Sequence, residues 1–291
     1  MRLRLIASVF ALCALMRAET APIETTKATL DVGIIVSDIE KAKAFYGGVL
    51  GLAHVTQAMP DGTTMYRFQS GSSSLKVRAF PKAAKYSNAL RGEIGIRLLT
   101  LFTYDLDGVV KRYVAGGAAQ PRVVPYGSRG VKLGFLTDPD GNELEIVGLP
   151  GVETSPAPDR MQIGLTVSDP EKSRAFYGQI LGLAEDKPQA QELLNGSLEY
   201  FFNAGKTQIK FWTGEREDLP RHTGNITDAM GFRYFTFLVK DVDATFAELK
   251  KRGATIVREP VDFGGIARIM MAADPDGNWV EFAAPKARPA K

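Results

Sequence analysis

Residues 32–55 read VGIIVSDIEKAKAFYGGVLGLAHV, and residues 163–186 read IGLTVSDPEKSRAFYGQILGLAED. The two stretches are identical at 14 of 24 aligned positions, which is far more than chance produces. A second pair follows each of them, DPDGNELE at 138–145 and DPDGNWVE at 274–281. The repeats therefore run in the order A, B, A′, B′, and this internal repetition indicates four copies of one structural unit.

Each unit is predicted to contain a strand, a helix and three further strands (βαβββ). The β-branched run at 32–36 predicts the first strand. Ser37 and Glu40 have the spacing of a helix capping box, and apolar residues then recur at helical spacing. The Asp-Pro-Asp-Gly-Asn stretch predicts a tight turn between the last two strands of each B unit. We interpret these repeated motifs as elements of the fold and not of the chemistry.

The chain has 291 residues, which is enough for two domains with two well-buried cores. The repeats place the first domain at 29–149 and the second at 160–285. Residues 150–159, PGVETSPAPD, carry three prolines and no periodicity, and are predicted to be the linker. We expect each domain to pair its own two units.

The N-terminus differs from the repeats. Arg2 and Arg4 precede a 12-residue apolar run, LIASVFALCALM, and a short polar stretch follows it. This pattern is typical of a cleaved export signal over residues 1–18, and the run is too short to span a membrane. The sequence therefore predicts an exported protein, periplasmic or secreted, without a stable membrane anchor. The alternative is an apolar N-terminal helix that belongs to the fold.

Removal of residues 1–18 would leave 33 basic and 33 acidic residues. The mature chain would then be nearly neutral with no basic stripe, which argues against nucleic acid as a partner. Cys13 is the only cysteine and would be cut away, so neither disulfides nor thiolate metal sites are expected in the mature protein.

The strings VSDxEKxxAFYxxxLGL and DPDGNxxE together resemble the vicinal oxygen chelate superfamily of glyoxalases, extradiol dioxygenases and bleomycin-resistance proteins. The resemblance covers about residues 29–285. It implies an α+β fold in which pairs of βαβββ units form curled mixed sheets, or cups, with helices outside. In that family a cup usually holds one divalent metal, and the ligands come from the first and last strands of each unit. Some members bind drugs without a metal.

The resemblance also implies which residues line the cups. First-strand ligands seven residues before the helix-start aspartate would be Asp31, Leu98, Gln162 and Tyr234, and last-strand positions would be Lys76, Glu145, Lys210 and Glu281. The first cup would then contain Asp31, Lys76, Leu98 and Glu145. The second would contain Gln162, Lys210, Tyr234 and Glu281, and Trp279 shares the strand face of Glu281 by the two-residue period.

These residues fit a metal poorly. The chain has two histidines, His54 and His222, and neither falls on a ligand position. An inward-facing lysine would repel a divalent cation, so the sequence predicts no metal and no other cofactor. Lys76 is expected to pair with Asp31 and Glu145, and Lys210 with Glu281. Such clusters would either anchor a polar ligand or merely fill a degenerate cup.

Three functions stay open at this point. The first is an exported binder of a small molecule that works without a catalytic metal. The second is a lyase, isomerase, epimerase or dioxygenase with an atypical site, for which Glu281 as acid or base and Tyr234 as hydrogen-bond donor are the best catalytic candidates. The third is a scaffold without a ligand. Four units in one chain can form both cups, so a monomer suffices, and a homodimer is the alternative.

Overall fold

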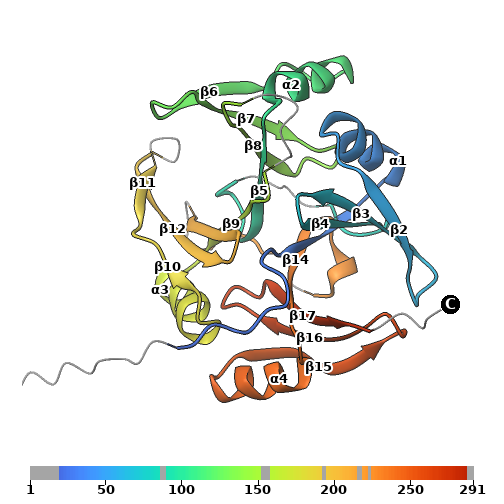
Figure 1. Ribbon diagram of the computed structural model, residues 1–291, viewed down its shortest axis with the longest axis vertical. Coiled ribbons are helices and arrows are strands. Elements are labelled where there is room, and N and C mark those ends of the chain that lie inside the picture. Colours follow the sequence, from blue (N-terminus) through green and yellow to red (C-terminus); the bar gives the residue numbers. More distant parts are fainter. Residues whose placement is uncertain are drawn as a thin grey trace, which may run out of the picture.

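Two mixed β-sheets form the body of the protein, as a computed structural model shows (Figure 1). The structure describes residues 20–85, 90–151, 158–191, 195–214, 218–221 and 224–286. The first sheet has eight strands in the order β15-β16-β17-β14-β1-β4-β3-β2, and the second has nine, with β10-β12-β13-β9-β5-β8-β7-β6 in order and β11 paired to β12. The helices lie around the periphery (Figure 1). The expected fold class, α+β with βαβββ units in mixed sheets and helices outside, is confirmed.

The strands and helices follow the predicted repeat. The first sheet contains β1 (Asp31–Val36), β2 (His54–Ala58), β3 (Thr64–Ser70), β4 (Ser73–Ala79), β14 (Gly231–Leu238), β15 (Thr255–Phe263), β16 (Ala267–Ala273) and β17 (Trp279–Pro285). The second contains β5 (Gly95–Thr103), β6 (Arg122–Tyr126), β7 (Val131–Thr137), β8 (Glu143–Gly148), β9 (Met161–Val167), β10 (Ala184–Glu185), β11 (Gln189–Gln191), β12 (Ser197–Ala204) and β13 (Thr207–Thr213). The helices are α1 (Ile39–Ala42) with η1 (Lys43–Val49), α2 (Leu106–Ala115), α3 (Pro170–Arg174) with η2 (Ala175–Ile180), η4 (Ile226–Asp228) and α4 (Val242–Lys251).

The pairing of the units differs from the expectation. β1 of unit A pairs antiparallel with β14 of unit B′, and β5 of unit B pairs antiparallel with β9 of unit A′. Each sheet therefore joins one unit from each half of the chain, and the prediction that residues 29–149 and 160–285 each close their own sheet is wrong. Both halves of the chain share one core between the two sheets, so each half contributes one unit to each sheet.

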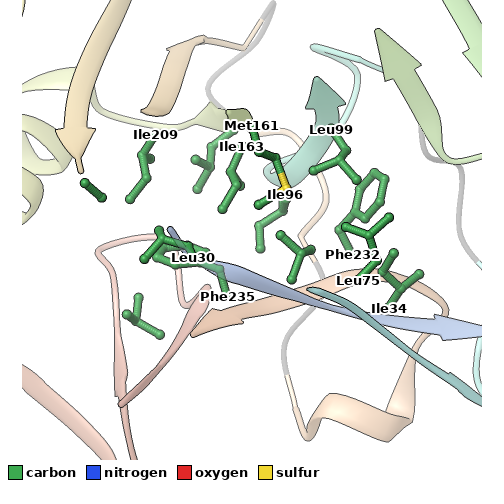
Figure 2. Packing of buried hydrophobic residues seen from close by; sticks show 14 of the residues in the cluster. Leu30, Ile34, Leu75, Ile96, Leu99, Met161, Ile163, Ile209, Phe232 and Phe235 are labelled. Carbon is green, nitrogen blue, oxygen red and sulfur yellow. The ribbon is translucent and has the colours of Figure 1, made fainter. Parts of the chain in front are cut away.

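The main hydrophobic core lies between the two sheets. Figure 2 shows the side chains of the first sheet facing those of the second across this space. The labelled residues are Leu30, Ile34, Leu75, Phe232 and Phe235 on one side, and Ile96, Leu99, Met161, Ile163 and Ile209 on the other. All belong to one cluster of buried residues, so the expected pair of separate cores is replaced by a core that both halves share.

The repeated turn motifs connect the two units within each half. Asp138 of the first Asp-Pro-Asp-Gly-Asn turn accepts a 2.8 Å hydrogen bond from the hydroxyl of Tyr46, and Asp274 of the second accepts one of the same length from Tyr177. Asp140 accepts a hydrogen bond from the backbone amide of Ser37. These buried contacts attach each B unit to the first helix of its own A unit although their strands lie in different sheets.

The helix caps also differ in detail from the expectation. Asp38, not Ser37, caps α1, because its carboxylate accepts hydrogen bonds from the backbone amides of Glu40 and Lys41. Asp169 caps α3 in the same way, with Pro170 at the start of the helix as expected. The capping side chain therefore stands one residue later than the box predicted.

An N-terminal arm, residues 20–30, crosses the molecule. The amide of Ile23 donates to the carbonyl of Leu181, and the amide of Thr26 donates to the carbonyl of Leu238. The expected export signal, residues 1–18, and most of the expected linker lie outside the described residues. Among the helices that the structure describes, none has the length and apolar character needed to cross a membrane.

Candidate functional site

Three polar side chains meet on the face of the first sheet that points away from the core, which we call the Lys76 face. The Lys76 ammonium, from β4, donates to the hydroxyl of Thr236 at 2.5 Å and to Glu281 Oε2 at 2.6 Å. Thr236 on β14 donates in turn to the same Glu281 oxygen at 2.6 Å. Strand register explains the meeting, since Thr236 lies directly opposite Glu281 in the parallel pair β14–β17. Lys76 and Glu281 are 6% and 8% exposed.

Tyr234 covers this cluster from β14. Its ring centroid lies 4.5 Å from the Lys76 ammonium, which is the geometry of a cation–π contact. The ring occupies the space above Gly33, where an added Cβ would lie 1.8 Å from Tyr234 Cε1. Glycine at position 33 therefore leaves room for the aromatic ring beside the ammonium.

The charges fix the protonation of Lys76. Burial alone would lower the pKa of its ammonium, but Glu281, Tyr234 and Asp31 outweigh that effect and raise the pKa to about 12. A lysine with this pKa stays charged at neutral pH and is unsuited to act as a general base. Burial raises the pKa of Tyr234, so its phenol stays protonated.

The second sheet carries the same three residue types on its corresponding face, which we call the Lys210 face. Lys210 on β13 donates to Glu145 Oε2 at 3.0 Å, and Thr100 on β5 donates to the same oxygen at 2.8 Å. Glu199 on β12 adds a second carboxylate 3.5 Å from the Lys210 ammonium. Burial raises the pKa of Glu199, and the charge of Lys210 opposes this rise. Burial alone would lower the pKa of Lys210, but Glu145 and Glu199 outweigh this effect and raise the pKa.

The lysine–glutamate pairs in the structure differ from those expected from the sequence. Lys76 bonds to Glu281 and not to Glu145, and Lys210 bonds to Glu145 and not to Glu281. Both expected partnerships are wrong for the same reason as the sheet pairing, since each lysine meets a glutamate from the other half of the chain. The expected mixture of a lysine and a glutamate in each cup nevertheless holds.

The other predicted lining residues fall around these clusters. Asp31 lines the Lys76 side but is held by Lys27 at 2.5 Å and by Arg67 at 3.0 Å. Gln162 donates to Gln208 at 2.8 Å. Leu98, which was assigned to the first cup, packs over Gly164 in the second sheet, and Trp279 lines the same cavity as Glu281.

Thr100 and Thr236 belong to the two polar clusters, and the sequence analysis did not name them. They stand five residues before Asp105 and Asp241, whereas the expected ligand positions stood seven residues before. A repeated signal existed, because each is a threonine at the same distance from a helix-start aspartate within an otherwise mostly apolar strand. Gly33 and Gly164 occupy the corresponding places in the A units.

A cavity of about 890 Å³ opens above the Lys76 cluster. Lys76, Tyr234, Thr236 and Glu281 belong to its lining, and apolar side chains from β16 and the loop before it cover another wall. Its volume lies within the roughly 300–1,000 Å³ that is typical of pockets for small molecules. The arrangement can therefore enclose a compact ligand next to a fixed ammonium–carboxylate pair.

The donor set does not fit a divalent metal. At the centre of the Lys76 face stand one carboxylate, one hydroxyl and one ammonium, and Gly33 contributes no side chain. Catalytic metal sites use about three histidine or carboxylate ligands with an open position. Within the described ranges no group of three or more His, Cys, Asp or Glu side chains is placed to hold an ion. The ring of His54, on exposed β2, lies tilted against that of Phe68 with the centroids 4.8 Å apart. His222 lies outside the described residues.

Comparison with known proteins agrees with this fold. A Mycobacterium tuberculosis protein named "Putative glyoxylase CFP32" is 23% identical over 256 residues, which cover 84% of this chain and 90% of that protein. A lactoylglutathione lyase of Pseudomonas aeruginosa is 28% identical over 144 residues, covering 40% of this chain and 77% of the lyase. The crystal structure of glyoxalase I from Zea mays superposes with a TM-score of 0.68 at 18% identity, covering 88% of this chain and 92% of that one.

A family model provides the broader assignment. The model of the Glyoxalase/Bleomycin resistance protein/Dioxygenase superfamily matches residues 29–146 and again residues 161–282. The two matches begin and end close to the two halves that the sequence repeat defines, and together they take in most of the chain. This protein is thus a member of the Glyoxalase/Bleomycin resistance protein/Dioxygenase superfamily.

Proposed function

We propose that this protein binds a small molecule in the cavity of the Lys76 face and that it does so without a divalent metal. The observation that supports this most directly is the preformed Lys76–Thr236–Glu281 cluster in the wall of an 890 Å³ cavity. An ammonium that is already neutralised and hydrogen-bonded offers a ligand a fixed polar anchor without leaving a buried charge unpaired. The apolar side chains nearby supply area for a partly apolar ligand.

An enzyme is the second candidate. Similarity to proteins named glyoxylase and lactoylglutathione lyase favours it, and Glu281 is the cavity carboxylate that would exchange a proton with a substrate. The geometry weighs against this role. Lys76 and Thr236 both donate to the same Glu281 oxygen, so this oxygen already accepts two hydrogen bonds and is poorly placed to take a proton from a substrate. The Tyr234 ring lies against Lys76.

The proposal is tested by elemental analysis and by thermal shift on the purified native protein. We expect well under one equivalent of iron, zinc, manganese or nickel, and a ligand from a library of small molecules that raises the melting temperature. A ligand at a hundredfold excess over its Kd stabilises the folded state by about 2.7 kcal/mol. The two faces offer matched variants, because Thr236→Val alters the proposed site while Thr100→Val alters its counterpart. Only Thr236→Val should weaken the ligand-induced shift.

Three results would contradict this proposal. About one equivalent of metal, lost together with a measured activity in Glu281→Gln, would establish the enzyme instead. A library in which nothing raises the melting temperature would favour a scaffold without a ligand. Equal effects of the two threonine variants would place the ligand elsewhere in the molecule.

Export is a separate proposal. It rests on the apolar run behind Arg2 and Arg4 and on the short polar stretch that follows this run. N-terminal sequencing of protein recovered from the cell envelope or the medium should begin near Glu19. Recovery of the bulk of the folded protein with Met1 intact would overturn the proposal.

A further inference from the structure

Positive charge exceeds negative charge in the lining of the cavity. The basic lining residues are Arg67, Lys76, Arg78, Arg258 and Lys286, and the acidic ones are Asp31, Asp61 and Glu281. Each of the three carboxylates already has a basic partner. Asp31 pairs with Arg67 and Lys27, Asp61 with Arg78, and Glu281 with Lys76. All three acidic side chains are therefore already in ion pairs, and the net charge of the lining is positive.

Among the described residues of the lining, the positive charge that has no acidic partner is that of Arg258, on the outer strand β15. Lys286, the other basic residue at the rim, bonds to Asp262 at 2.8 Å, but within the described part of the chain Arg258 shows no acidic partner. The pairing of β15 with β16 is irregular on both sides of Arg258, between Ile256 and Arg258 and again between Arg258 and Val261. Irregularities of this kind re-aim side chains and are frequent next to binding sites.

Apolar side chains lie beside Arg258. Met271 stands directly opposite Arg258 in the β15–β16 pair and lines the cavity. It belongs to a small apolar cluster, separate from the main core, against which Phe263 and Trp279 pack. A partly buried apolar wall next to an arginine without an acidic partner is complementary to a molecule with an apolar body and an anionic group.

We propose that the cavity selects amphipathic anions, with the apolar body on the Met271 wall and the negative group at Arg258. This inference rests on the proposed function and narrows it to a ligand class. A cationic ligand of the same shape would meet the positive surplus of the lining and would be repelled. Arginine is suited to the opposite case, because its planar guanidinium donates two parallel hydrogen bonds to a carboxylate, sulfonate or phosphate.

Two fluorescent probes with the same apolar skeleton separate these terms. The anionic probe 1-anilinonaphthalene-8-sulfonate and the uncharged N-phenyl-1-naphthylamine differ by the sulfonate group. Titration of the folded protein should show saturable binding of both probes, with the anionic one bound about fivefold or more tightly, as one charge-assisted contact at a partly exposed site provides. Arg258→Gln should remove most of this preference and leave the uncharged probe unaffected. Arg258→Lys should keep part of it.

Lys111→Gln is the matched control, because it removes one exposed positive charge from α2, which packs against the other sheet. It should leave both affinities unchanged. Equal affinity for the two probes would overturn the selectivity and leave the proposed function standing. An equal loss in Arg258→Gln and Lys111→Gln would show a general field effect and overturn the assignment to Arg258. If neither probe binds saturably, the assignment of amphipathic anions fails, while the proposed function is decided separately by the thermal-shift screen.

Discussion

Replacement of Lys210 by methionine is expected to lower the free energy of unfolding by about 3–5 kcal/mol at pH 7. Methionine keeps most of the side-chain volume but removes the ammonium that lies 3.0 Å from Glu145 and 3.5 Å from Glu199. Two carboxylates would then stay buried without a counter-charge. Urea unfolding followed by circular dichroism measures the loss.

The loss should depend on pH with a defined sign. Burial already raises the pKa of Glu199 in the folded protein, and removal of Lys210 raises it further. A carboxylate whose folded pKa lies above its unfolded value of about 4.3 destabilises the folded state increasingly as the pH rises through the folded pKa. The difference between Lys210→Met and wild type should therefore be smallest near pH 4 and largest at pH 7 and above.

Two further variants control this experiment. Lys210→Met combined with Glu145→Gln should recover part of the lost stability, because only one buried carboxylate then lacks a partner. Lys172→Met, which breaks an ion pair with Asp169 on the surface, should have little effect. A Lys210→Met protein as stable as wild type at pH 7, or a deficit that grows on acidification, would contradict the role assigned to the ammonium.

Separation of the two halves should have the other large effect. Neither residues 20–151 nor residues 158–286 alone should form a stable monomer, since each half leaves its edges of the β1–β14 and β5–β9 pairs open and exposes its side of the shared core. Co-expressed halves should copurify as a 1:1 complex. Size-exclusion chromatography and thermal unfolding of each sample test this.

A cleavable linker provides the control for that experiment. A protease site introduced between residues 151 and 158 and cut after folding should leave a complex with nearly the stability of the intact protein. A half that is monomeric and unfolds cooperatively at the temperature of the full chain would show that the cross-pairing is not required for stability.

The fold class could be read from the sequence because the repeat is local. Each strand, helix and turn is specified within about 60 residues, and the Asp-Pro-Asp-Gly-Asn turns mark the same place in both halves. The partner of β1 could not be read in this way. Units B and B′ present first strands with the same apolar pattern, so the local sequence offers β5 and β14 as equivalent partners. The choice is made by tertiary packing across the chain.

The candidate site was predicted in part, for a related reason. Lys76, Lys210, Glu145 and Glu281 belong to the two polar clusters, whereas the first-strand threonines of these clusters stand two residues after the positions expected from the sequence. Side chains alternate between the two faces of a strand with a period of two. A position that is wrong by two residues therefore lies on the same face of the strand, but farther along the strand. For this reason the sequence analysis named Leu98 and Tyr234 in place of Thr100 and Thr236.

The crossed ion pairs have a consequence for the origin of the chain. Each half carries one lysine and one glutamate of the two clusters, and each lysine meets the glutamate of the other half. This reciprocal exchange is the arrangement of an isologous interface, in which two identical subunits related by a two-fold axis present the same surface to each other. An ancestor half as long would already have been self-complementary, and duplication with fusion would have made its homodimer covalent. In a fused chain the two halves can differ, and they do so here, because one face has Tyr234 over its lysine and the other has a second carboxylate at Glu199.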